Sequence, residues 1–230
     1  MADRLSTSQS AYFAEVAYRG PLDPVVASYA EPKMAFLAQH VPLTGRILDI
    51  GCGNGIFTHR FARYTDSVVG LDFSPRLLRE NPHNRLICGD ATKLPFPDES
   101  FDLSFEANLL HHVADRNAVI GEMARVSRKY VAILEPNRNN PLMLGFGLVV
   151  KTERGSLVST PKHLRGELTL AGLKLVASIT TGMISQNNTP KLLVPFLRRF
   201  NKPIWWGEYI VMVAERPSAD FGINIPATQD

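Results

Sequence analysis

The chain has 230 residues, of which 45% are hydrophobic and 20% are charged, and 25 Lys and Arg against 22 Asp and Glu give a formal net charge of +3. A chain of this size buries roughly 70% of its unfolded surface, which excludes a disordered protein and a small disulfide-stapled scaffold. Cys52 and Cys88 lie far apart, with no Cys-x-x-Cys pair and no Cys/His cluster. We therefore expect no metal site, no disulfide framework and a location in the reducing cytoplasm.

The sequence contains no pattern typical of membrane insertion. Its start, Met1 to Thr7, lacks the apolar core of a signal peptide. The longest apolar run, Pro141 to Val150, is about half the ~20 residues that a spanning helix needs. We expect a soluble protein.

Residues 46–136 alternate short β-rich runs with helical stretches, which is typical of a parallel sheet with helices on its faces. Ser74 followed by Pro75 is a typical helix start, because a serine can cap the helix and proline fits its first turn. The expected strands are 46–50, 67–73, 85–88, 101–105 and 130–134, and the expected helices are 55–64, 75–80 and 116–127.

Other segments flank this core and complete one structural domain. Residues 1–45 read as a helical cap, whose Tyr12, Tyr18 and Tyr29 we interpret as packing residues in preference to a cofactor lid. Residues 137–206 read as an insertion or lid that faces the substrate, with a helix at 161–170 and a strand at 173–179. Residues 207–217 supply the last strand, centred on 209–214.

The first expected strand ends in the run LDIGCGNG, with glycines at 51, 53 and 55. Such a turn accepts positive φ angles and lets a ligand approach the backbone without meeting a Cβ. The dinucleotide fingerprint G-x-G-x-x-G would need glycine where Ile56 stands. Asp49, just before the turn, is a poor neighbour for a pyrophosphate but suits a cationic ligand.

Asp72 closes the second strand, 23 residues after Asp49. An acidic side chain at roughly this offset can accept charge-assisted hydrogen bonds from both ribose hydroxyls. The alternative role is a helix N-cap, but Ser74 is closer to the helix, so we favour ribose binding for Asp72.

Four motifs in register carry a family resemblance: LDIGCGNG, GLDFSP, GDATKLPFPDESFDLSFEANLLHHV, and EMARV followed by a strand that ends in EPN. Together they span about residues 40–136. This stretch resembles the class I S-adenosylmethionine-dependent methyltransferases, particularly the small-molecule group that includes ubiquinone and menaquinone C-methyltransferases. The resemblance implies a three-layer α/β/α Rossmann-like fold, with a mostly parallel seven-stranded sheet whose last strand is antiparallel.

The resemblance also implies roles for residues at the ends of the strands. Asp49, Gly51, Cys52 and Gly53 would face the methionine part of S-adenosylmethionine, and Asp72 would grip the ribose with Phe73 and Ser74 beside the adenosine. Asp90 and Ala91 would read the adenine. Glu106 and Ala107, with Asn108, would pass the methionine and its transferable methyl.

Two features of the sequence restrict the chemical class of the methyl acceptor. Base aminomethyltransferases carry an Asn/Asp-Pro-Pro-aromatic box after the fourth strand, which Glu106-Ala107-Asn108-Leu109 is not, so we expect no nucleic-acid acceptor. Residues 138–216 hold 11 Lys and Arg against 4 Asp and Glu, a net +7, whereas residues 1–137 hold 14 against 16, a net −2. This basic, apolar half suggests an apolar or acidic small molecule, or peripheral association with an anionic membrane.

Methyl transfer from a sulfonium is promoted mainly by alignment, so a dedicated base is optional. His111 and His112 follow the fourth strand, and we favour a structural role for the pair, with His111 as the candidate base if either acts. Two alternative functions stay open: a nicotinamide-dependent oxidoreductase, disfavoured by Ile56 and Asp49, and a non-catalytic partner protein that binds S-adenosylmethionine.

Overall fold

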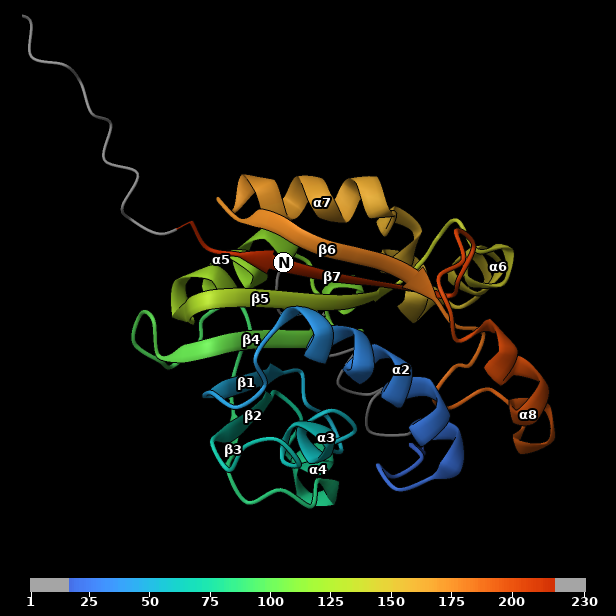
Figure 1. The fold of residues 1–230 in the computed structure, drawn as a ribbon, viewed down its shortest axis with the longest axis horizontal. Coiled ribbons are helices and arrows are strands. Elements are labelled where there is room, and N and C mark those ends of the chain that lie inside the picture. Colours follow the sequence, from blue (N-terminus) through green and yellow to red (C-terminus); the bar gives the residue numbers. More distant parts are fainter. Residues whose placement is uncertain (1–16, 218–230) are drawn as a thin grey trace, which may run out of the picture.

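The computed structural model describes residues 17–217, which build a seven-stranded sheet between two layers of helices (Figure 1). The strand order is β3-β2-β1-β4-β5-β7-β6. All pairings are parallel except those of β7 with β5 and β6, which are antiparallel. The expected Rossmann-like sheet with one antiparallel last strand is confirmed. The strands are β1 (Ile47–Ile50), β2 (Val68–Asp72), β3 (Leu86–Cys88), β4 (Phe101–Ala107), β5 (Ser127–Pro136), β6 (Lys174–Thr181) and β7 (Tyr209–Glu215).

Side chains of the central strands alternate between two buried clusters, one on each face of the sheet. In β5, Ala132 and Leu134 join the cluster under α2 and α3, whereas Val131 and Ile133 join the cluster under α5 and α7. Because the residues on both faces of these strands are buried, the strands form continuous apolar runs in the sequence. The main helices are α2 (Pro24–His40), α3 (Thr58–Phe61), α4 (Pro75–Glu80), α5 (Arg116–Val126), α6 (Pro141–Val149), α7 (Pro161–Leu170) and α8 (Val194–Leu197).

The prediction of a helix at 55–64 is wrong in its length, because only Thr58–Phe61 is α-helical. Gly55 has a φ of +93°, which a right-handed helix does not accept, so the glycine turn extends past it. The end is also irregular: Arg63 and Tyr64 donate to the carbonyls three residues before them. By contrast α4 begins and ends where expected, with the Ser74 hydroxyl accepting from the N–H of Leu77.

The outer segments differ from the helical cap that the sequence predicts. Residues 17–23 form no helix before α2, and Tyr12 lies outside the described residues. After β5 the chain forms α6, the 3₁₀ segment η2 (Lys151–Val158) and α7, so the predicted insertion includes regular elements of the sheet and its cover. No helix among residues 17–217 is long and apolar enough to cross a bilayer.

Candidate functional site

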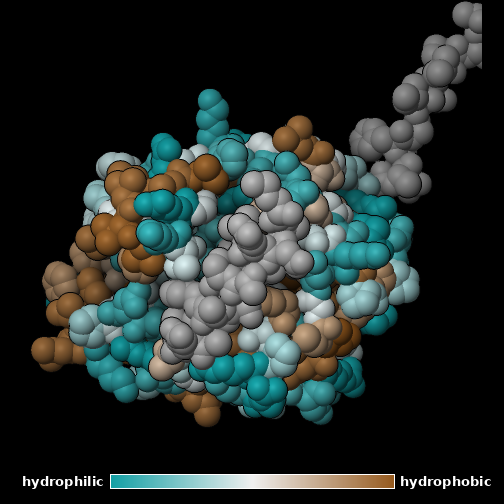
Figure 2. All heavy atoms as spheres, turned by 180° about the vertical axis from the view of Figure 1, so that it is seen from behind, coloured by the Kyte–Doolittle hydropathy of each residue, from teal (hydrophilic) through white to brown (hydrophobic). Residues whose placement is uncertain are grey.

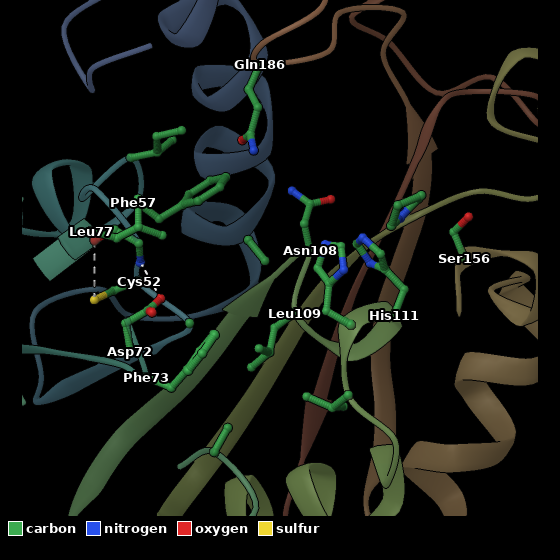
Figure 3. A pocket seen from close by; sticks show the side chains of 18 of the residues that line it. Cys52, Phe57, Asp72, Phe73, Leu77, Asn108, Leu109, His111, Ser156 and Gln186 are labelled. Atoms are coloured by element: carbon green, nitrogen blue, oxygen red, sulfur yellow. Dashed lines mark hydrogen bonds between the residues drawn. The ribbon is translucent and has the colours of Figure 1, made fainter. Parts of the chain in front are cut away.

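A cavity of about 980 Å³ opens at the carboxyl ends of β1, β2 and β4. Open α/β sheets bind their ligands at this edge, and the volume is at the upper end for a small-molecule site. Figure 3 shows Asp72 and His111 on opposite sides of it, with Asn108 and Leu109 between them. The cavity brings together these predicted site residues: Asp49, Gly51, Cys52, Gly53, Asp72, Phe73, Asp90, Ala91, Ala107 and His111.

The glycine turn after β1 supplies the floor of this cavity. Gly51 has a φ of +68°, and a Cβ there would lie 3.2 Å from the Leu109 side chain. Gly53 has a φ of +50°, and a Cβ there would meet only Leu77, at 3.9 Å. Gly51 therefore allows close packing inside the protein, whereas Gly53 leaves its backbone open to a ligand.

Asp72 accepts a hydrogen bond on each carboxylate oxygen. The N–H of Gly53 donates to Oδ2 over 2.9 Å and the N–H of Ser74 donates to Oδ1 over 2.8 Å. Burial raises the pKa of Asp72, although these two hydrogen bonds act in the opposite direction. The backbone N–H of Phe73 lowers the pKa of Asp72 in the same way, and a carboxylate has about four acceptor positions, so Asp72 can still accept a hydroxyl group from the cavity.

Asp49 lies beneath the turn and is almost fully buried. Its Oδ2 accepts a hydrogen bond of 2.6 Å from the Thr58 hydroxyl. The pKa of Asp49 is raised to about 7, mainly by burial, while hydrogen bonds to Thr58 lower it and the nearby Asp72 carboxylate raises it. Near neutral pH this carboxyl can therefore ionise in response to a positive charge placed beside it.

Some of the residues predicted to contact the cofactor line the cavity and others do not. Asp90 and Ala91 line the cavity, and the Asp90 Oδ1 accepts from the N–H of Thr92 at 2.8 Å. Ser74 and Glu106 do not line it. Glu106 is fully buried and accepts from the N–H groups of Leu109 and Leu134, at 3.1 Å and 3.2 Å. Glu106 therefore braces the backbone around the site, and a direct contact of its side chain with the cofactor stays a prediction.

Asn108, directly after β4, has a φ of +56°. Asn tolerates this left-handed conformation better than most residues, and the turn directs the chain into the 3₁₀ segment η1 (Leu110–His112). The Asn108 amide donates to the Tyr29 hydroxyl at 2.8 Å. Tyr29 thus reaches the site through Asn108, which agrees with the packing role expected for it.

His111 is buried between two carboxylates. Its Nδ1 lies 2.9 Å from Glu135 Oε2, and its Nε2 lies 3.3 Å from Glu153 Oε2. Burial alone would lower the pKa of His111, but the two carboxylates outweigh it and raise the pKa to about 10. Because both ring nitrogens lie beside carboxylates, the arrangement favours the structural role expected for His111, and a general-base role stays a prediction.

Two acidic residues of this cluster, Glu135 and Glu153, are not among the site residues predicted from the sequence. Glu135 ends β5 at the same edge as the glycine turn, and its position just before Pro136 could have pointed to it. Glu153 comes from η2, seventeen residues after Pro136, and only the fold brings it to His111. His112, also on the cavity wall, has its pKa lowered to about 3 by burial and by the charge of His111.

The segment before α2 covers the glycine turn. Asn54 donates to the carbonyl of Arg19 at 3.0 Å, and Arg19 in turn donates to Asn187 and Thr189. Tyr18 lines the cavity beside them. This segment and the loop at 185–189 therefore form one wall over the predicted cofactor end.

Comparison with known proteins agrees with this geometry. The Methyltransferase domain family matches residues 48–133. A demethylmenaquinone methyltransferase of Roseiflexus castenholzii is 37% identical over 123 residues, 49% of this chain and 52% of its own length. A 27-O-demethylrifamycin SV methyltransferase of Amycolatopsis mediterranei is 39% identical over 105 residues, 40% of this chain and 39% of its own. The chain thus spans about half the length, or less, of these curated relatives.

Solved structures extend the similarity of fold to almost the whole chain. A SAM-dependent methyltransferase of Thermotoga maritima superposes with a TM-score of 0.68, covers 93% of this chain and 97% of its own, and is 17% identical. These comparisons give no support to the nicotinamide oxidoreductase alternative. Residues 48–133 thus match a methyltransferase domain, and almost the whole chain shares the fold of a solved SAM-dependent methyltransferase.

Proposed function

We propose that this protein transfers a methyl group from S-adenosylmethionine to an apolar or acidic small molecule of the quinone or secondary-metabolite type. One observation carries the proposal: a single cavity joins the acidic glycine cradle at Asp49 and Asp72 to an apolar wall made by Met143, Phe146 and Val150. The names of the menaquinone and rifamycin relatives agree with such acceptors.

The cradle fits the cofactor on its own chemistry. The open space at Gly53 lets a ligand approach the protein backbone, and Asp72 can still accept a hydrogen bond from a ribose hydroxyl. Asp49 offers negative charge to a cationic centre. When bound, the cofactor supplies an activated methyl on a sulfonium, so the protein contributes mainly alignment and exclusion of water.

The acceptor end has an outer surface that fits a membrane. On α6, Leu142, Leu148 and Val149 are exposed, and near α8 Leu192 and Phe196 are exposed; we call these five residues the α6–α8 face. Figure 2, seen from behind, shows hydrophobic residues gathered at this edge of the molecule. The exposed cations nearby in the sequence include Lys151, Arg154, Arg199 and Lys202.

We infer that the α6–α8 face binds anionic lipid, because apolar side chains flanked by Lys and Arg favour such a surface. Binding there would place the cavity wall formed by α6 next to a lipophilic acceptor. We expect co-sedimentation with vesicles of phosphatidylglycerol and phosphatidylcholine but not with phosphatidylcholine alone. The double variant L148S/V149S should lose this binding, whereas L170S, which removes an equally exposed leucine on α7, should keep it. Equal sedimentation of both variants would contradict the inference.

Methyl transfer itself is tested with labelled S-adenosylmethionine. The purified protein should label a polyprenyl naphthoquinol or a phenolic acid supplied in detergent, with the product identified by mass spectrometry, and D72N should reduce the labelling about ten-fold or more at limiting S-adenosylmethionine. Tight binding of S-adenosylhomocysteine without transfer to any acceptor in a cell extract would instead support the non-catalytic partner function.

A further inference from the structure

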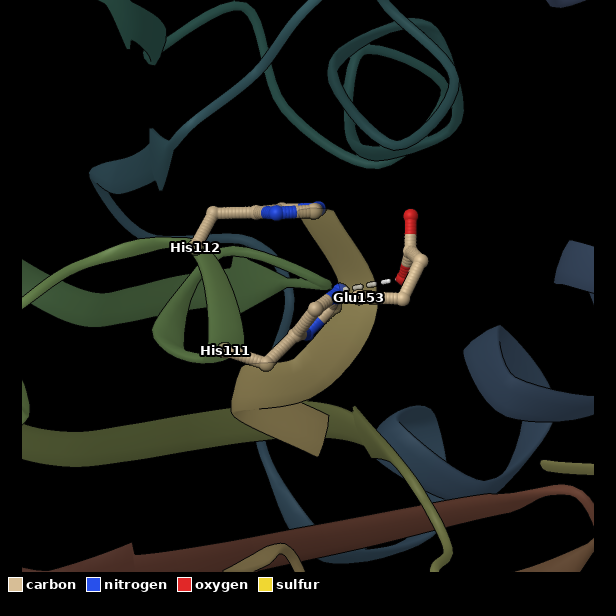
Figure 4. A group of neighbouring side chains, drawn as sticks. All are labelled: His111, His112 and Glu153. Carbon is tan, nitrogen blue, oxygen red and sulfur yellow. Dashed lines mark ion pairs between the residues drawn. The ribbon is translucent and has the colours of Figure 1, made fainter. Parts of the chain in front are cut away.

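Three potential metal ligands meet at the acceptor end of the cavity: His111 and His112 from η1, and Glu153 from η2 (Figure 4). All three line the cavity, and their ligand atoms lie within 4.8 Å of one another. Two imidazoles and one carboxylate are a common donor set for divalent transition metals such as Zn²⁺, Co²⁺ and Fe²⁺. Mg²⁺ and Ca²⁺ prefer sites made of oxygen ligands.

The spacing of the first two donors already matches a coordination site. His111 Nε2 and Glu153 Oε2 are 3.3 Å apart. Two ligands at about 2.0 to 2.1 Å from a tetrahedral metal lie roughly 3.3 Å from each other. The His111 and His112 rings are tilted by 45° with their centroids 4.0 Å apart, and the ligand atoms of all three residues lie within 4.8 Å of one another.

The surroundings fix the His111 ring in the orientation that metal binding needs. Its Nδ1 faces Glu135, which also accepts from the N–H of Leu110 at 3.1 Å and from the Ser159 hydroxyl at 3.4 Å. Metal-bound histidines almost always donate their second nitrogen to such a carboxylate, which directs the other nitrogen at the metal. Glu135 holds His111 in this way, with Nε2 directed to Glu153, and a metal ion bound there would displace the proton that Nε2 otherwise shares with Glu153.

A glycine allows η2 to approach His111. A Cβ on Gly155 would collide with the backbone carbonyl of His111. Because η2 follows the apolar helix α6, this contact closes the acceptor end of the cavity with Glu153 on its inner side. This contact between the backbones of η1 and η2 does not involve the three side chains, but it brings Glu153 close to the two histidines.

We propose that His111, His112 and Glu153 bind one divalent transition-metal ion at the acceptor end of the cavity, with Glu135 as the positioning residue for His111. This departs from the expectation of no metal site, because the sequence shows the adjacent histidines but not Glu153. The ion keeps open coordination positions toward the cavity and stabilises negative charge on an acceptor oxygen. That last role rests on the proposed methyl transfer, whereas metal binding does not.

Cobalt titration of the chelator-treated full chain tests the site. We expect one Co²⁺ per chain, with visible absorption bands typical of a site containing nitrogen ligands, and competition by Zn²⁺. E153Q and H112Q should each weaken binding about 10-fold or more, and E135Q should weaken it by a similar factor through His111. H163Q is the matched control, since His163 is an exposed histidine on α7, and it should bind Co²⁺ like the unaltered protein.

Affinity for S-adenosylhomocysteine, measured in the same samples, separates the two proposals. E153Q and H112Q should bind it normally, which also shows that they fold. Absence of Co²⁺ binding in a protein that binds S-adenosylhomocysteine would overturn the metal site and leave the proposed function intact. Equal Co²⁺ affinity in E153Q, H112Q and H163Q would overturn the assignment of the ligands.

Discussion

The backbone N–H of Gly53 donates a hydrogen bond of 2.9 Å to Oδ2 of Asp72 and so joins the glycine turn after β1 to the end of β2. Oδ1 of the same carboxylate holds the N–H of Ser74, the cap of α4. One side chain thus anchors two backbone segments of the cradle and presents its remaining lone pairs to the cavity. Substitution of Asp72 should therefore affect both the shape of the cradle and ligand affinity.

We expect D72N to weaken binding of S-adenosylhomocysteine about ten-fold or more, because the amide loses the charge and one acceptor toward the ribose hydroxyls. D72A should also lower the free energy of unfolding by roughly 1 to 3 kcal/mol, since it leaves two N–H groups without their acceptor. Calorimetric titration and urea denaturation measure the two effects. D66N, an exposed aspartate before β2, serves as the control. Unchanged affinity in D72N would contradict the ribose role.

The buried carboxyl of Asp49 predicts a pH dependence of cofactor binding. Its pKa is raised to about 7, mainly by burial. A cationic ligand favours the ionised form, so the affinity for S-adenosylmethionine should rise with pH through about 7 and proton release should accompany binding below it. S-Adenosylhomocysteine lacks the sulfonium charge and should show a weaker dependence. In the free protein the sign is reversed: folded Asp49 holds its proton longer than the unfolded carboxyl, so its contribution to stability falls as pH rises toward 7.

Calorimetry of both ligands at about pH 6 and about pH 8 checks this, and we expect the ratio of their affinities to change several-fold. T58V should move the dependence to higher pH, because the Thr58 hydroxyl lowers the pKa of Asp49. D49N should remove it. A constant ratio in the unaltered protein would show that the sulfonium is not near Asp49.

The sequence predicts the centre of the sheet well because β1, β4, β5 and β7 are buried on both faces over most of their length and contain long apolar runs. The predicted ends of the strands differ from the observed ends by a few residues. For example, β5 begins at Ser127, directly after α5 and without a loop. The part of the site that follows from the sequence lies in short motifs at the ends of strands, such as Gly51 and Gly53 after β1 and Asp72 at the end of β2. The neighbours of His111 lie 24 and 42 positions along the chain, and only the folded arrangement reveals that Glu135 and Glu153 surround it.

A buried lysine predicts a second pH effect, on stability. Lys33 on α2 is 1% exposed, donates to the carbonyl of Tyr29 at 2.7 Å, and lies over the rings of Tyr29 and Tyr209. Burial lowers the pKa of Lys33 to about 7, although Glu208 raises it. Between this value and the unfolded pKa of about 10.4, the unfolded chain binds more protons, so stability rises with pH from about 7 to about 10.

We expect K33M to lose a slope of about 1 kcal/mol per pH unit in the free energy of unfolding over this window. Urea denaturation at several pH values measures the slope. K162M, which removes an exposed lysine on α7, should keep it. Identical slopes in K33M and the unaltered protein would show that Lys33 keeps an ordinary pKa when folded.

The last prediction concerns the proline inside α2. Pro32 has no N–H, so the carbonyl of Ser28, four residues earlier, receives no helical hydrogen bond. Asn201, just after the 3₁₀ segment η4 (Arg198–Phe200), donates its side-chain amide to this carbonyl at 3.0 Å, and Arg198 donates to the Ser28 hydroxyl. The segment after α8 therefore supplies the donor that the helix lacks.

We expect N201A to lower the free energy of unfolding by roughly 1 to 2 kcal/mol, because it leaves the Ser28 carbonyl unsatisfied. In a P32A background the helix provides its own N–H, so the same N201A change should cost clearly less. Urea denaturation of the four proteins of this double-mutant cycle measures the coupling between Pro32 and Asn201. Equal costs in both backgrounds would mean that Asn201 stabilises the protein through other contacts and that α2 tolerates Pro32 without it.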